Sequence, residues 1–201
     1  FIAGLKMTPV ILGWKWYELT GSKLALGVLG LSEVIPAILL ALPAGVRVDR
    51  SNKRNLIMWC YFFYLLVMIY LGIVTYKPIT SQFSNMLAAG MICFGVFITG
   101  IIRAYSSPAL NAFLAQLVTQ AELVRAASIN TMSWLIASVI GPMVAGFLIG
   151  FTSATWSFLV VCTLMIMALG IFRYVAEKPI SWNKGKARTW DGVKEGLEFV
   201  Y

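Results

Sequence analysis

Residues 24–45 read LALGVLGLSEVIPAILLALPAG, a nearly unbroken apolar stretch in which Glu33 is the one charged side chain. A helix needs about 20 apolar residues to cross the hydrocarbon core of a bilayer, so this stretch is long enough to span a membrane. Similar stretches occupy residues 1–17, 55–76, 86–116, 122–148 and 155–176. The sequence therefore predicts an all-α membrane protein with six transmembrane helices.

The composition excludes an ordinary soluble domain. Of the 201 residues, 60% are hydrophobic and 12% are charged, whereas soluble domains have about 45–50% and about 25%. The sequence contains no histidine, and its three cysteines lie inside apolar stretches without the spacing of metal ligands. We therefore expect no metal and no cofactor. We also expect no enzyme activity, because an intramembrane protease needs a Ser–His pair or two Asp residues within its spans.

The net charge of +8 indicates how the helices are oriented rather than a nucleic-acid partner. Eleven of the 16 Lys and Arg residues lie between the second and third stretches, between the fourth and fifth, or after the sixth. Only Lys23 and Lys77 lie in the opposite connections. By the positive-inside rule, the 2–3 loop, the 4–5 loop and the C-terminal tail are cytoplasmic. We expect a multi-pass protein of a bacterial cytoplasmic (inner) membrane.

The chain divides into two parts. Residues 1–176 are predicted to form the six-helix transmembrane bundle, and its first helix is expected to be truncated because Phe1 already lies inside an apolar run. Residues 177–201 are predicted to form a cytoplasmic linker. Within the linker, Trp190, Val193 and Leu197 recur at helical spacing, which predicts a short amphipathic helix on the membrane surface.

Prolines and polar side chains at membrane depth mark the first, second, fourth and fifth stretches. The prolines are Pro9, Pro36, Pro43, Pro108 and Pro142. The polar residues are Lys6, Glu33, Arg103, Asn111 and Asn130. Both are costly in a spanning helix, so matching broken helices in two halves predict a 3+3 inverted repeat and a transporter module whose substrate path they line. The alternative is that proline is simply frequent in membrane helices.

The candidate residues for a substrate cavity or for proton coupling are Glu33, Arg103, Asn111, Asn130 and Trp134. Glu33 is the only acidic residue within a span, so it would carry a coupling proton or bind a cationic part of a substrate. Its alternative role is that of a permanently paired or protonated packing residue. Arg103 would bind an anionic substrate group, or pair with a carbonyl or with Glu33. Trp134 would stack on an aromatic substrate or pack in the bundle.

The connection after the second stretch reads GVRVDRSNKR, residues 45–54. It resembles the loop signature G-x-x-x-D-R-x-G-R-[RK] of the major facilitator superfamily. The matching residues are Gly45, Asp49, Arg50, Lys53 and Arg54. Asn52 replaces the second glycine, and it is the residue that next best tolerates a left-handed turn.

A second stretch, GPMVAGFL at residues 141–148, resembles the glycine-proline signature of antiporters in the same family. Its matching residues are Gly141, Pro142 and Gly146, for which the resemblance implies helix packing. Together with RAYSSPA at residues 103–109, these segments are similar to the branch of enterobactin exporters and drug–proton antiporters.

The resemblance implies that the chain is the N-terminal half of a major facilitator fold, with a C-terminal six-helix half, the lipid bilayer, protons and a small-molecule substrate as partners. The motif around Asp49 is then a cytoplasmic gate latch. The expected function is secondary active transport, namely proton-coupled export of a small amphipathic molecule such as a siderophore or drug by alternating access. The alternatives are a lysophospholipid or lipid transporter on the same scaffold, or the membrane domain of an ABC exporter.

Overall fold

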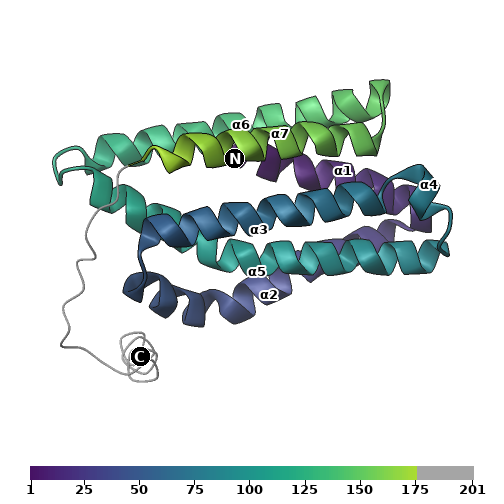
Figure 1. Cartoon of the computed structure of the whole chain (residues 1–201), viewed down its shortest axis with the longest axis horizontal. Helices are drawn as coiled ribbons and strands as arrows, with labels where there is room; N and C mark the ends of the chain where they lie inside the picture. Colours follow the sequence, from purple (N-terminus) through teal and green to yellow (C-terminus); the bar gives the residue numbers. More distant parts are fainter. Residues whose placement is uncertain (176–201) are drawn as a thin grey trace.

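The computed structural model describes residues 1–175, which form an elongated bundle of helices (Figure 1). The helices of this part of the chain are α1 (Ile2–Thr20), α2 (Lys23–Arg50), α3 (Lys53–Val74), α4 (Lys77–Thr80), α5 (Asn85–Leu117), α6 (Leu123–Phe151) and α7 (Ala154–Arg173). Six of them are long and run side by side, whereas α4 is a single turn at one end. The predicted all-α bundle is confirmed, and the long helices begin and end within a few residues of the predicted stretches. The predicted linker and amphipathic helix at 177–201 lie outside the described residues.

The helices differ in how well they suit a membrane. Within residues 1–175, α2, α3, α5, α6 and α7 are long and apolar enough to cross one. The sixth long helix, α1, is less apolar because it carries Lys6, Lys15 and Glu18. It contacts α2, α5, α6 and α7, so much of its surface faces protein rather than lipid. A central helix can hold polar groups that a lipid-facing helix cannot.

The packing follows the predicted 3+3 repeat. In such a repeat, α1 corresponds to α5, α2 to α6 and α3 to α7. The pair α2–α5 in one set therefore corresponds to the pair α6–α1 in the other. Both of these pairs pack extensively. The pair α3–α5 likewise corresponds to α7–α1, and both are in contact. Each set contains an odd number of spans, so the two sets run in opposite directions through the bundle, as an inverted repeat requires.

The buried core lies among α1, α3, α5 and α7. Its fully buried side chains include Met68, Leu71, Ile92, Phe158 and Met165. By contrast, only Gly141 and Ala145 of α6 are buried, and α2 is also exposed along most of its length. The faces of α2 and α6 are therefore left open within residues 1–175.

The predicted loop from Gly45 to Arg54 is wrong in its extent. Helix α2 continues through Arg50 and α3 begins at Lys53, so only Ser51 and Asn52 lie between them. Arg47 and Arg50 stabilise the end of α2, because positive charge is favourable at a helix C-terminus.

The left-handed turn implied for Asn52 is also wrong. Its backbone is extended, with φ −66° and ψ 106°, and its side-chain oxygen accepts a hydrogen bond of 3.3 Å from the backbone N–H of Asn55. Asn52 is thus the N-cap of α3, a role for which asparagine is strongly preferred and in which glycine is a weaker choice.

Candidate functional site

The centre of the site is an ion pair between α2 and α5. The Nη1 atom of Arg103 lies 2.6 Å from the Oε1 atom of Glu33. The Glu33 side chain is 22% exposed and that of Arg103 is 45% exposed, so the pair is only partly enclosed within residues 1–175. Of the alternatives open for these two residues, the structure contains the mutual pairing.

The pair can form because α2 and α5 approach closely at Gly100, which lies one helical turn before Arg103. A Cβ atom at Gly100 would collide with the carbonyl oxygen of Glu33 and would lie 2.7 Å from the Cγ atom of Pro36. Glycine is therefore required here by the close approach of two backbones. Gly100 is the residue that brings Arg103 within reach of Glu33.

A cavity of about 280 Å³ lies next to the ion pair, between α1, α5 and α6. Four of the five predicted site residues line it, namely Arg103, Asn111, Asn130 and Trp134. Ser106 and Ser107 of α5 add two hydroxyl groups to the same wall. The prediction from prolines and polar residues thus finds side chains that lie together in space, although they come from helices distant in the sequence.

A second cavity, of about 180 Å³, also lies next to the ion pair. It is lined by Glu33 together with Thr8, Tyr64 and Thr99. Leu5 and Pro9 of α1 line both cavities. Glu33 thus lines one cavity and its partner Arg103 lines the other, so the ion pair links the walls of two neighbouring cavities.

Lys6 is a site residue that the predicted set omits. Its Nζ atom lies 3.3 Å from the centroid of the Trp134 ring, in a cation–π contact, and it lines the same cavity as Arg103. The sequence contained a signal for this position, because Lys6 is one of the polar residues at membrane depth. With Lys6 and Arg103 against Glu33, the group carries two positive charges and one negative charge.

Gly141 holds α6 against α1 at the level of Lys6. A Cβ atom at Gly141 would lie 2.7 Å from the Cβ atom of Lys6 and 3.2 Å from the carbonyl oxygen of Ala3. Pro142 follows it and is half-buried. Gly146, in contrast, has no atom within 4 Å of the position of a Cβ. Of the two glycines in this motif, only Gly141 makes a close approach within residues 1–175.

Replacing Gly141 with alanine is expected to lower the stability of the protein by about 1–3 kcal/mol, because an added methyl group would overpack the contact between α1 and α6. Thermal unfolding of the purified protein measures the loss. Gly170→Ala is the matched control, since a Cβ at this position of α7 meets open space. Equal melting temperatures for the two variants would show that the approach at Gly141 is not needed.

The residues of the 45–54 motif lie together at one end of the bundle. Asp49 and Arg50 are exposed on the last turn of α2, whereas Lys53 and Arg54 are half-buried on the first turn of α3. The Nη2 atom of Arg54 donates a hydrogen bond of 2.7 Å to the backbone carbonyl of Arg173 in the last turn of α7. Arg54 therefore ties α3 to the C-terminus of α7 within this half.

At the same end, Glu122 lies in the connection between α5 and α6 and interacts with Thr119. Its carboxylate accepts hydrogen bonds from the hydroxyl (2.8 Å) and the backbone N–H (3.4 Å) of Thr119. These hydrogen bonds lower the pKa of the Glu122 carboxyl below its ordinary value.

Comparisons with known proteins agree with this arrangement. A staphyloferrin A transporter of Staphylococcus aureus (strain NCTC 8325 / PS 47) is 25% identical over 150 residues, or 74% of this chain. The match covers 36% of the relative, so the chain spans little more than a third of its length. The sequence also matches the Major Facilitator Superfamily over residues 1–200. This family consists of transporters, which agrees with the expectation that the protein is not an enzyme. The chain belongs to the major facilitator superfamily.

Proposed function

We propose that the chain is the N-terminal half of a secondary active transporter that exports a small amphipathic molecule, such as a siderophore or a drug, in exchange for protons. The observation that carries the proposal is the ion pair between Glu33 and Arg103, which lies on spanning helices next to two cavities. Charged groups at this depth are rare and mark ion and substrate pathways. The name of the staphyloferrin A transporter supports a siderophore as the substrate. Membership of the family argues against the alternative of an ABC exporter.

A second six-helix half is the proposed partner of the open faces. Large apolar side chains of α2 and α6, such as Leu39 (72% exposed) and Val139 (69% exposed), have no cover within residues 1–175. The cavity beside Arg103, lined by α1, α5 and α6, is only partly enclosed. A second half packed against α1, α2, α5 and α6 would close the cavity and leave α3 and α7 to the lipid. Rocking one half against the other would then give alternating access.

Antiport requires that a proton and the substrate exclude each other. A substrate that donates a hydrogen bond to Glu33 and accepts one from Arg103 uses the ionised pair. Protonation of Glu33 removes its negative charge and releases Arg103, so such a substrate binds more weakly. Protonation of Glu33 has the opposite effect on a substrate that binds only through an anionic group, because it frees Arg103 to bind that group. The direction of the pH effect therefore distinguishes antiport from symport.

Glu33→Gln is expected to abolish uphill transport driven by a pH gradient, while exchange of substrate across the membrane continues at a saturating substrate concentration. The amide keeps the shape of the carboxyl group but carries no proton at any pH in use. Proteoliposomes containing the full transporter, with staphyloferrin A as the first substrate tested, measure both activities.

Glu122→Gln is the control for this experiment, because Glu122 is an exposed acid outside both cavities. It should transport like the wild-type protein. Undiminished pH-driven accumulation by Glu33→Gln would remove Glu33 from the coupling mechanism. Loss of exchange as well would instead place Glu33 in substrate binding.

Transport of a lysophospholipid or another lipid on the same scaffold is the second candidate. The open apolar faces of α2 and α6 favour it, because a lipid would enter the cavity sideways from the bilayer. Competition in the same proteoliposomes separates the two functions. A lysophospholipid that is itself moved, and that blocks movement of the siderophore, would support this second candidate.

We also propose that Asp49 is part of a latch that closes the cytoplasmic side. An exposed carboxylate at this end of α2 can pair with the N-terminus of a helix in the second half. Asn111→Cys provides a thiol whose labelling from the cytoplasmic side reports opening. Asp49→Asn is expected to raise the rate of this labelling by up to about fivefold, because one such interaction contributes up to about 1 kcal/mol. Glu122→Gln is again the control, and the three native cysteines must first be replaced. An unchanged labelling rate would reject the latch.

A further inference from the structure

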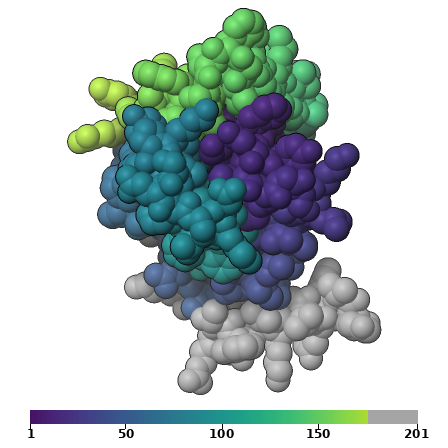
Figure 2. Space-filling view, turned by 90° about the vertical axis from the view of Figure 1, so that its right-hand side faces the viewer, coloured from purple at the N-terminus to yellow at the C-terminus, as the bar shows by residue number. Residues whose placement is uncertain are grey.

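A cavity of about 650 Å³ lies at the end of the bundle opposite the turn between α2 and α3. The C-terminal end of α1, the connection from α3 to α4 and the connection from α6 to α7 meet there. Figure 2 looks onto this end and shows α1 beside the other two segments. None of the residues that line this cavity lines the two cavities next to Glu33. It is therefore a separate site.

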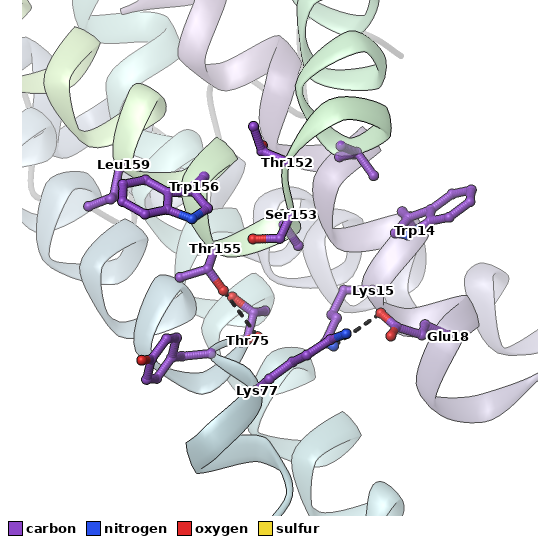
Figure 3. Close-up of a pocket in the computed structure, with 13 residues that line it drawn as sticks. Trp14, Lys15, Glu18, Thr75, Lys77, Thr152, Ser153, Thr155, Trp156 and Leu159 are labelled. Atoms are coloured by element: carbon purple, nitrogen blue, oxygen red, sulfur yellow. Dashed lines mark hydrogen bonds and ion pairs between the residues drawn. The ribbon is translucent and has the colours of Figure 1, made fainter.

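The cavity has an excess of positive charge. Lys15 is only 4% exposed, and its Nζ atom lies 3.0 Å from the Oε2 atom of Glu18 (Figure 3). Lys77 is a second lysine in the lining and is exposed. Within residues 1–175, Lys15 forms an ion pair with Glu18, and Lys77 has no ion-pair partner. Two lysines and one glutamate leave one positive charge for a ligand.

The N-terminus of α7 adds hydrogen-bond donors to the same cavity. Ser153 is the N-cap of this 20-residue helix, and its side chain makes no capping hydrogen bond. The first backbone N–H groups of a helix have no partner within the helix, and they lie at the positive end of its dipole. Ser153 lies on the wall that faces Lys15 (Figure 3). Two lysines, a free hydroxyl and a helix N-terminus are groups that bind phosphate.

The surroundings of the cavity indicate that the phosphate belongs to a lipid. Trp14 is 59% exposed and Trp156 is 62% exposed, and both line the cavity. Tryptophan is enriched at the level of lipid head groups, where one part of the ring is in hydrocarbon and the N–H is in water. Leu159, one turn further along α7, is also exposed and leads from the cavity to the apolar surface of that helix.

We propose that this cavity binds the phosphodiester head group of an anionic phospholipid, with the acyl chains along the exposed face of α7. In the orientation given by the positive-inside rule, the lipid belongs to the outer leaflet. The proposal rests on the transmembrane arrangement of the helices and not on the substrate or the coupling ion of the transporter. Its test therefore needs no transport, and it can fail while the proposed transport function holds.

The test is a lipid-binding measurement on the full transporter by native mass spectrometry, with phosphatidylglycerol and phosphatidylcholine offered in equal amounts. Lys77→Gln is the main variant, since Lys15 is buried and its replacement is more disruptive. The matched control is Lys23→Gln, which removes an exposed lysine at the same end of the bundle but outside the cavity. We expect Lys77→Gln to weaken retention of phosphatidylglycerol by about fivefold, as for the loss of one basic side chain at an anionic membrane surface. Lys23→Gln should leave retention unchanged.

Three outcomes would overturn the proposal. Equal retention of the two lipids by the wild-type protein would show that the cavity does not select an anionic head group. Equal losses in Lys77→Gln and Lys23→Gln would show that the attraction comes from the overall charge of this end. Complete displacement of phosphatidylglycerol by inorganic phosphate would show that the site takes a soluble anion rather than a lipid.

Discussion

Gly100→Ala is expected to separate α2 from α5 and to abolish transport. The added methyl group would collide with the backbone carbonyl of Glu33 and with the ring of Pro36, and neither group can rotate away as a flexible side chain does. The pair α2–α5 has the most extensive contact between helices within residues 1–175, so the strain falls on a principal packing surface. Overpacking of this kind costs about 1–3 kcal/mol or more and should lower the melting temperature by several degrees.

Gly90→Ala is the control on the same helix, because a Cβ at Gly90 meets open space. It should leave stability unchanged or raise it slightly, since alanine favours a helix over glycine. Transport is to be measured at a temperature at which Gly100→Ala is still folded. Normal transport by a folded Gly100→Ala protein would mean that the close approach of α2 and α5 is dispensable, and equal melting temperatures for the two variants would contradict the packing argument.

The positions of the long helices were predictable from the sequence because lipid is a stringent solvent. A run of about 20 apolar residues has few structures available to it in a bilayer other than a helix, so the ends of α5 fall close to the ends of its apolar stretch. The turn between α2 and α3 was mispredicted for a local reason. Asn52 can tolerate a left-handed turn or cap a helix, and the motif alone does not distinguish the two.

The sequence predicted which residues line the cavity beside Arg103, but it did not predict how they interact. Arg103, Asn111 and Asn130 were found because polar groups in spanning helices avoid lipid, whatever their partners are. The pairing of Arg103 with Glu33 depends on the approach at Gly100, which brings together residues 70 positions apart in the sequence. The contact of Lys6 with Trp134 depends in the same way on Gly141. Such contacts depend on how the helices pack, and the hydropathy of the sequence does not indicate which helix faces meet.

Arg103→Gln is expected to destabilise the full transporter more than the double variant Glu33→Gln, Arg103→Gln. The single change leaves the Glu33 carboxylate without its partner on a spanning helix, whereas the double change leaves two neutral amides that can hydrogen-bond each other. Breaking a fully buried pair costs about 3–5 kcal/mol, and because Arg103 is 45% exposed we expect about 1–3 kcal/mol here. Thermal unfolding of the wild-type protein, both single variants and the double variant gives the coupling free energy of the pair.

Transport measurements on the same four proteins distinguish the contribution of the ion pair to stability from its role in proton coupling. The double variant should recover stability but not pH-driven transport, because Glu33 no longer exchanges a proton. Arg125→Gln, which removes an exposed arginine on the first turn of α6 outside both cavities, is the control and should match the wild-type protein in both assays. A double variant as unstable as the sum of its single variants would show that Glu33 and Arg103 do not stabilise each other. A double variant that still accumulates substrate against its gradient would show that the proton travels by another route.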